Sequence, residues 1–246
     1  MLTRVHHVGL VVRRLADGLA LWRDRLGLEV SAQATVADQG VQAALLPIGR
    51  SEIELLEPID ERGGVAKFLA KRGEGLHHVC FETPDVAAEL ASARERGFPV
   101  IDEAPRPGLA GTICFLHPRG TAGVLVEFAT PPAGATHHAP AARGPLAGLA
   151  LREVQAHSRA GAAAADLFAT RLGLARDGET AVAVGGVRLH FVSSDERDGL
   201  AGLVLEVDDL AAARDTLDAL GPTAAGEAVA LAPAYCHGVP ITVAAR

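Results

Sequence analysis

One segment of this sequence occurs twice. Residues 5–30 (VHHVGLVVRRLADGLALWRDRLGLEV) return at residues 76–100 as LHHVCFETPDVAAELASARERGFPV, displaced by 71 positions with one deletion. Both copies carry His-His-Val in an apolar run, followed by an amphipathic stretch and a glycine, which is typical of a strand followed by a helix. The segment IELLEP at 53–58 likewise returns as VEFATP at 126–131. Such a chain is expected to fold as repeated modules.

A fainter copy of this whole first half follows it. The matching segments are RLGL at 25–28 and 171–174, residues 77–97 and 202–221, and GVLVEF at 123–128 with GVPITV at 238–243. Within the first module, VQAALLPI (41–48) and SEIELLEP (51–58) have the composition of two further strands joined by a turn. We therefore predict an α+β fold of four βαβββ-type modules, whose mixed sheets curl into cups.

The two halves are separated by a stretch of different composition. Residues 131–148 (PPAGATHHAPAARGPLAG) are mostly Pro, Gly and Ala without a hydrophobic period, which is typical of a linker. We predict one domain over residues 1–130 and a second over residues 149–246. A chain of 246 residues is long enough for two domains of ordinary size.

Composition limits the classes of partner. The net charge of −7 offers no basic surface for nucleic acid or an anionic membrane, and no apolar run approaches the ~20 residues that span a bilayer. Three cysteines (Cys80, Cys114 and Cys236) are too few and too scattered for a disulfide framework. We expect a soluble, cytoplasmic protein with reduced thiols, and neither a nucleic-acid nor a membrane partner.

The repeat pairs His7 with His78 and Glu54 with Glu127. Two modules related by an approximate two-fold axis bring equivalent positions face to face, and an unpaired polar group in an apolar strand is costly. Two imidazoles and two carboxylates suit a borderline divalent metal, with two octahedral positions left for water or substrate. The alternation of side chains along a strand turns one histidine of each doublet inward and the other outward, and the spacing does not say which.

The same residues carry a resemblance to a known family. HHVGLVV, QGVQAALLPIG, VAKFLAKRGEGLHHVCFE and FLHPRGTAGVLVEF make residues 3–130 similar to the methylmalonyl-CoA epimerases of the vicinal oxygen chelate (glyoxalase/bleomycin resistance/dioxygenase) superfamily. The resemblance implies two tandem glyoxalase-like domains and a divalent metal (Co, Mn, Zn, Ni or Fe). It places the metal ligands on His7, Glu54, His78 and Glu127, and so selects the second histidine of each doublet.

The implied activity is that of an isomerase. It is epimerisation of a 2-substituted malonyl-CoA thioester, such as methylmalonyl-CoA, by C2 deprotonation and reprotonation through a metal-stabilised enolate. We assign Glu127 as both ligand and base. Some epimerases have a second glutamate after QGV, where this chain has Ala43, and Asp38 is a nearby acid. The alternatives are a glyoxalase-type isomerase, a ring-cleaving dioxygenase, or a non-enzymatic small-molecule binding or resistance protein.

The second half lacks the donor set. Its four equivalent positions fall on Glu153, His190, Gly202 and Thr242, and a glycine offers no side-chain ligand. We expect a degenerate domain without a metal site, and one metal per chain. Because the family's epimerases are typically homodimers of short chains, the extra half is expected to replace the partner in a monomer with an internal pseudo-dimer, to cover the pocket, or to leave a homodimer.

Overall fold

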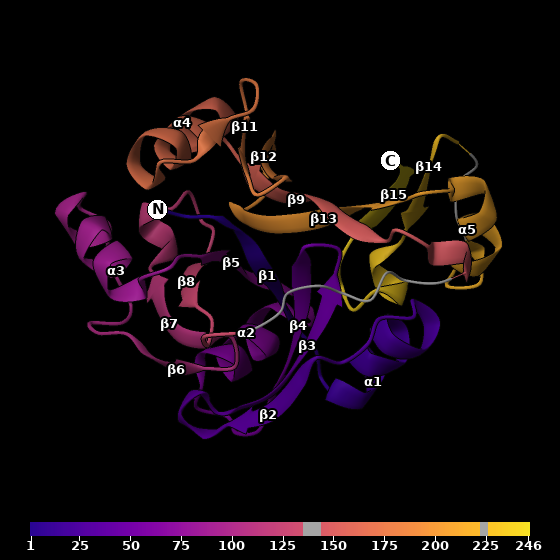
Figure 1. Cartoon of the computed structure of the whole chain (residues 1–246), viewed down its shortest axis with the longest axis horizontal. Coiled ribbons are helices and arrows are strands. Elements are labelled where there is room, and N and C mark those ends of the chain that lie inside the picture. The colour runs from indigo at the N-terminus through magenta and orange to yellow at the C-terminus, as the bar shows by residue number, and fades with distance from the viewer. Residues whose placement is uncertain (135–143, 222–225) are drawn as a thin grey trace. The chain divides into compact units, whose positions relative to one another are not determined.

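The computed structural model describes residues 1–134, 144–221 and 226–246 (Figure 1). Their strands form two sheets, one of eight strands and one of seven. The first sheet has the order β2-β3-β4-β1-β5-β8-β7-β6, and the second has the order β10-β11-β12-β9-β13-β15-β14. Parallel and antiparallel pairs occur in both, since β5 pairs with β8 in parallel and β7 pairs with β8 antiparallel, with the same contrast in the second sheet. The predicted α+β class with mixed sheets is confirmed.

The first sheet is made by two modules. The first module comprises β1 (Arg4–Val11), α1 (Leu15–Leu19), η1 (Ala20–Arg25), β2 (Ala32–Val36), η2 (Ala37–Gln39), β3 (Val41–Ile48) and β4 (Ser51–Pro58). The second comprises β5 (Gly75–Glu82), α3 (Val86–Glu95), β6 (Arg106–Gly108), β7 (Gly111–Leu116), η3 (Pro118–Gly120) and β8 (Val126–Thr130). Helix α2 (Gly64–Arg72) connects them, and the repeat did not predict it.

The second sheet repeats this order. The third module comprises η4 (Gly144–Leu146), β9 (Ala150–Ser158), α4 (Gly161–Leu172), β10 (Ala175–Arg176), β11 (Ala181–Val184) and β12 (Val187–Ser193). The fourth comprises β13 (Gly199–Val207), α5 (Leu210–Asp218), β14 (Ala228–Leu231), η5 (Pro233–Tyr235) and β15 (Ile241–Ala245). Within the described residues, the fourth module has one strand fewer than the others.

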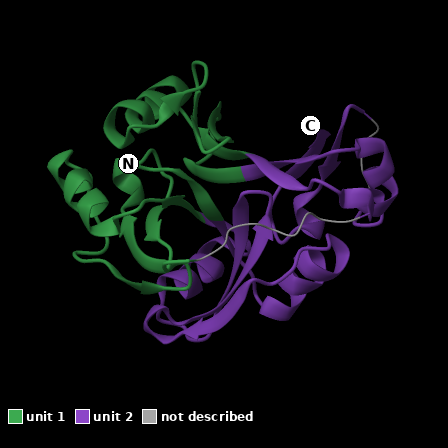
Figure 2. Cartoon of the chain, in the orientation of Figure 1, with its two compact units in different colours: residues 1–7, 78–136, 153–201 green, residues 8–77, 137–152, 202–246 purple. Residues whose placement is uncertain are grey.

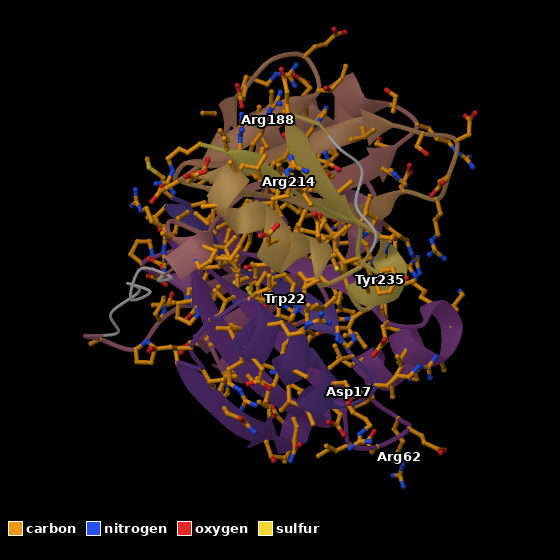
Figure 3. All side chains as sticks on the ribbon, turned by 90° about the vertical axis from the view of Figure 1, so that its right-hand side faces the viewer. Asp17, Trp22, Arg62, Arg188, Arg214 and Tyr235 are labelled. Atoms are coloured by element: carbon orange, nitrogen blue, oxygen red, sulfur yellow. The ribbon has the colours of Figure 1, made fainter. Side chains whose placement is uncertain are left out.

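Local chemistry explains why the helices start where they do. Asp85 precedes α3, and its side chain accepts a hydrogen bond of 3.0 Å from the Ala88 N–H. Asp209 does the same before α5, where the bond from the Ala212 N–H is also 3.0 Å. Such N-caps satisfy a backbone donor that has no partner inside the helix. The amphipathic stretch of the first module forms α1 and then a π-helical turn, η1, in which Trp22 (labelled in Figure 3) is fully buried.

The chain divides into two compact units, and each takes elements from both sheets (Figure 2). Unit 1 consists of Met1–His7, His78–Thr136 and Glu153–Ala201, and unit 2 consists of Val8–His77, His137–Arg152 and Gly202–Arg246. Each unit therefore contains close contacts between the first and second halves of the chain.

In unit 1 these contacts involve two glycines and an arginine. A Cβ at Gly185, in the β11–β12 turn, would collide with the backbone of Arg4, and one at Gly123 would collide with Asp198. The Arg171 guanidinium donates to the carbonyl of Arg96, the C-cap of α3. At Gly185 and Gly123 the two halves of the chain can approach this closely because glycine has no side chain.

Unit 2 contains the repeat-equivalent contacts. A Cβ at Gly49, in the β3–β4 turn, would collide with Ala150, and one at Gly238 would collide with the carbonyl of Glu74. The Arg25 guanidinium donates to the carbonyl of Ala219, the C-cap of α5. By the repeat, Gly49 corresponds to Gly185, Gly238 to Gly123, and Arg25 to Arg171. Each of the three contacts therefore occurs once in each unit, with the roles of the two halves exchanged.

The predicted linker and domain boundaries stay predictions. Residues 135–143, including His137 and His138, lie outside the described residues. Near the end of the predicted linker (residues 131–148), Leu146 in η4 is buried. Among the described helices, none has both the length and the apolar character needed to cross a bilayer.

Candidate metal centre

The four central strands of the eight-stranded sheet each carry one predicted ligand. Strands β4, β1, β5 and β8 are neighbours in that order, and they hold Glu54, His7, His78 and Glu127. All four side chains are buried, although they lie in otherwise apolar strands. The duplication explains this arrangement, because the same strand of each module supplies the same kind of donor.

Three of these side chains contact one another within unit 1. The Nε2 atoms of His7 and His78 are 2.9 Å apart. Oε2 of Glu127 lies 3.1 Å from Nε2 of His7 and 2.9 Å from Nε2 of His78. Phe115 packs edge-on against the His78 ring, with 5.4 Å between the ring centroids. Two imidazole nitrogens and a carboxylate oxygen therefore converge in an apolar surrounding.

Electrostatics keep Glu127 ionised in spite of its burial. Removal from water by itself raises the pKa of a carboxyl group. The imidazoles of His7 and His78 more than offset this, through their charge and their hydrogen bonds, so the net shift lowers the pKa of Glu127. The carboxylate is thus in the form that binds a cation.

The donor spacing fits a small divalent cation. With metal–ligand bonds of ~2.1 Å, neighbouring ligands lie about 3.0 Å apart in an octahedral site and about 3.4 Å apart in a tetrahedral one. The three observed spacings of 2.9, 2.9 and 3.1 Å are short enough for one such ion to contact all three donors. Donor atoms of His7, Glu54, His78 and Glu127 all lie within 4.8 Å of one another, so the four residues form a possible divalent-metal site.

His6 differs from the expectation for the first histidine of a doublet. Instead of pointing outward, its side chain is buried, and its Nδ1 lies 2.9 Å from Nδ1 of His7. The physical reason is that every residue of β1 is buried, so neither face of this central strand meets solvent. His77, the equivalent residue in β5, is half-buried and packs edge-on against Phe68, with centroids 5.0 Å apart.

Comparison with known proteins agrees with this fold. Residues 6–115 match the model of the glyoxalase/bleomycin resistance protein/dioxygenase superfamily. The ethylmalonyl-CoA/methylmalonyl-CoA epimerase of Cereibacter sphaeroides is 36% identical over 131 residues, which are 52% of this chain and 98% of that protein. The mitochondrial methylmalonyl-CoA epimerase of Bos taurus is 32% identical over 129 residues, which are 52% of this chain and 74% of that protein.

A solved structure extends the comparison to three dimensions. It is a methylmalonyl-CoA epimerase variant of Streptomyces coelicolor in complex with 2-nitronate-propionyl-CoA. Its sequence is 40% identical, the match covers 54% of this chain and all of that one, and the TM-score is 0.53. The chain belongs to the glyoxalase/bleomycin resistance protein/dioxygenase superfamily. Its first half is an enzyme domain of the methylmalonyl-CoA epimerase type, as the resemblance implied.

One position of this epimerase-like domain lacks an acid. Ala43 is fully buried in β3, where it pairs with Leu56 of β4. Asp38, the nearby acid in the sequence, lies exposed in η2.

A buried carboxylate that the sequence analysis did not single out is that of Glu52, in β4. It lies two residues before Glu54, hence on the same face of β4, and accepts a hydrogen bond of 3.0 Å from the Ser31 hydroxyl. A charged residue inside an apolar strand was the signal for it.

In the second half, only two of the predicted positions come together. Nδ1 of His190 lies 3.2 Å from Oε1 of Glu153. The other oxygen of Glu153 is 3.3 Å from a guanidinium nitrogen of Arg188, and Arg188 also pairs with Asp177. Gly202 and Thr242 lie in β13 and β15 and bring no strong ligand. The carboxylate of this half is thus neutralised by a side chain.

Proposed function

We propose that the chain is a metal-dependent epimerase of a 2-substituted malonyl-CoA thioester such as methylmalonyl-CoA. The observation that carries the proposal is the convergence of His7, His78 and Glu127, at 2.9–3.1 Å, in a domain whose relatives are epimerases of this substrate class. The solved relative from Streptomyces holds an acyl-CoA ligand, which supports the substrate class.

In this proposal His7, Glu54, His78 and Glu127 hold the metal. A bound divalent metal supplies Lewis acidity that favours loss of the proton between a thioester and a carboxylate. His7 and His78 bring neutral nitrogen donors, and Glu54 and Glu127 bring two negative charges that offset the charge of the ion. Burial of all four fixes their orientation.

Glu127 is also the proposed base. Its contacts to both imidazoles involve Oε2, so we assign proton transfer to Oε1. The C2–H bond breaks, the proton passes to Oε1, and the electron pair spreads onto the thioester carbonyl. A proton returned to the opposite face of C2 completes the inversion. Ala43 has no group for that return, so the second proton comes from water or from another residue of the chain.

Solvent exchange tests this activity. Co²⁺-loaded protein is incubated with methylmalonyl-CoA in deuterated buffer, and deuterium at C2 is measured by NMR. We expect exchange together with loss of stereochemical purity. A fully metallated protein that gives neither would overturn the proposal. Protein that shows no exchange but isomerises a hemithioacetal, or cleaves a catechol with Fe²⁺ and oxygen, would instead be one of the other superfamily enzymes.

We further propose that the second half takes the place of a partner subunit. Two copies of a chain that meet about a two-fold axis make every contact twice, with the roles exchanged. The Arg171–Arg96 contact in unit 1 and the Arg25–Ala219 contact in unit 2 have this reciprocal relation. We therefore expect a monomer. Sedimentation equilibrium that gives the mass of two chains would contradict it.

A further inference from the structure

The contact between His6 and His7 is the starting point. Both side chains are buried, their Nδ1 atoms lie 2.9 Å apart, and their ring planes meet at 87°. At this distance a hydrogen bond joins the two nitrogens, and one proton lies between them. One ring must donate and the other must accept.

The far side of the His7 ring decides which ring donates. Its Nε2 is the atom that faces Nε2 of His78 and Oε2 of Glu127, at 2.9 and 3.1 Å. A nitrogen that binds a metal does so through its lone pair, so the neutral His7 ring must carry its proton on Nδ1. His7 is then the donor, and Nδ1 of His6 is the acceptor.

We infer that His6 is a positioning residue for the metal centre, whose Nδ1 accepts the Nδ1–H of His7 and holds Nε2 of His7 in the metal-binding form. The inference rests on the proposed metal centre and concerns a residue outside its ligand set. Histidine ligands generally donate their second N–H to a carboxylate, a carbonyl or water. Here an imidazole fills that place, and His6 in turn keeps its own proton on Nε2.

His77 provides a matched control inside the chain. It precedes the ligand His78 just as His6 precedes His7, so the two doublets are alike in sequence. In the structure, however, His77 is half-buried and packs against Phe68, whereas the His78 ring packs against Phe115. A phenylalanine at position 6 therefore removes a hydrogen bond to a ligand, whereas a phenylalanine at position 77 keeps an aromatic ring next to Phe68.

Metal affinity gives the first test. Co²⁺ is titrated into the metal-free full-length protein and its variants, with the visible absorption of the bound ion as the signal. We expect His6→Phe to weaken Co²⁺ binding about 10- to 100-fold, as losses of such outer partners do, and His77→Phe to change it less than about 3-fold. His6→Gln, which keeps an acceptor oxygen, should recover part of the loss.

A second measurement reads the proton itself. In protein labelled with ¹⁵N-histidine and loaded with Zn²⁺, we expect the Nδ1 proton of His7 to show a scalar coupling to Nδ1 of His6 across the hydrogen bond. This signal reports the donor and acceptor directly, and a merely structural role for His6 would not produce it. A proton on Nε2 of His7 in the loaded protein would overturn the inference.

The outcomes separate this inference from the proposed centre. Wild-type protein that binds no Co²⁺ overturns both. Wild-type protein that binds Co²⁺, with equal affinity in His6→Phe, overturns the role of His6 and leaves the centre standing. Donor atoms of His6, His7 and Cys80 also lie within 4.8 Å of one another, so Co²⁺ bound there is the competing explanation. In that case Cys80→Ser would lose the ion, and the inference would be wrong.

Discussion

Nε2 of His78 lies 2.9 Å from Oε2 of Glu127, and the two residues come from neighbouring parallel strands. If both are metal ligands, His78→Ala should weaken divalent-metal binding by more than about 100-fold, since loss of an outer partner alone costs about 10- to 100-fold. Elemental analysis after gel filtration measures it. His77→Ala serves as the control. Equal metal loss in both variants would show that the choice of His78 over His77 as the ligand is wrong.

Glu127→Gln should abolish C2 proton exchange. The variant keeps the shape of the side chain and removes the carboxylate that the neighbouring imidazoles hold in its ionised form. General-base catalysis contributes about 10²- to 10⁴-fold, so we expect a loss of at least this size. The rate must be measured at saturating Co²⁺, with metal content determined on the same sample. Exchange that persists in the fully loaded variant would remove Glu127 as the base.

We predict one tightly bound metal per chain. In the second half, the carboxylate of Glu153 pairs with Arg188 and His190, and a cation there would have to displace the guanidinium. Glu153→Ala and His190→Ala should therefore leave the stoichiometry at one. A stoichiometry of two, reduced by either substitution, would show a second working site.

The contact between Gly185 and Arg4 should contribute to stability. Gly185 and Gly186 both have positive φ, of 60° and 87°, so an alanine is strained at either position. Only at Gly185 would the new Cβ also collide, with the backbone of Arg4. We expect Gly185→Ala to lower the free energy of unfolding by about 1–3 kcal/mol more than Gly186→Ala does, the usual cost of overpacking. Equal denaturation midpoints would contradict this close packing.

Two of the cysteines should be unreactive in the native protein. Burial raises the pKa of the Cys114 thiol to about 12 and that of Cys236 to about 11. The thiolate is the reactive form of cysteine. Because pH 8 lies several units below the pKa of both thiols, almost none of either is ionised at that pH. We expect iodoacetamide to leave Cys114 and Cys236 unmodified at pH 8 and to label both after denaturation. Peptide mass spectrometry reads the result, and native labelling at either position would mean that the region opens to solvent.

Much of the fold was predicted from the internal repeat. The repeat predicted a strand followed by a helix in each module and the pairing of His7 with His78 and of Glu54 with Glu127, while composition predicted β3 and β4 with the ends that are observed. The reason is physical. Duplicated modules bury duplicated faces, so a polar residue in equivalent apolar strands points to the same place in both copies.

Other features depended on the tertiary structure, because they arise between segments whose distance in space the sequence does not encode. Both doublets read His-His-Val, yet His6 is buried beside the predicted ligand His7, whereas His77 is half-buried and packs against Phe68. The pairing of Arg188 with Glu153, which fills the degenerate site, depended on two parallel strands meeting in register. The sequence by itself determined which residue types recur, and only the folded chain decided which of them touch.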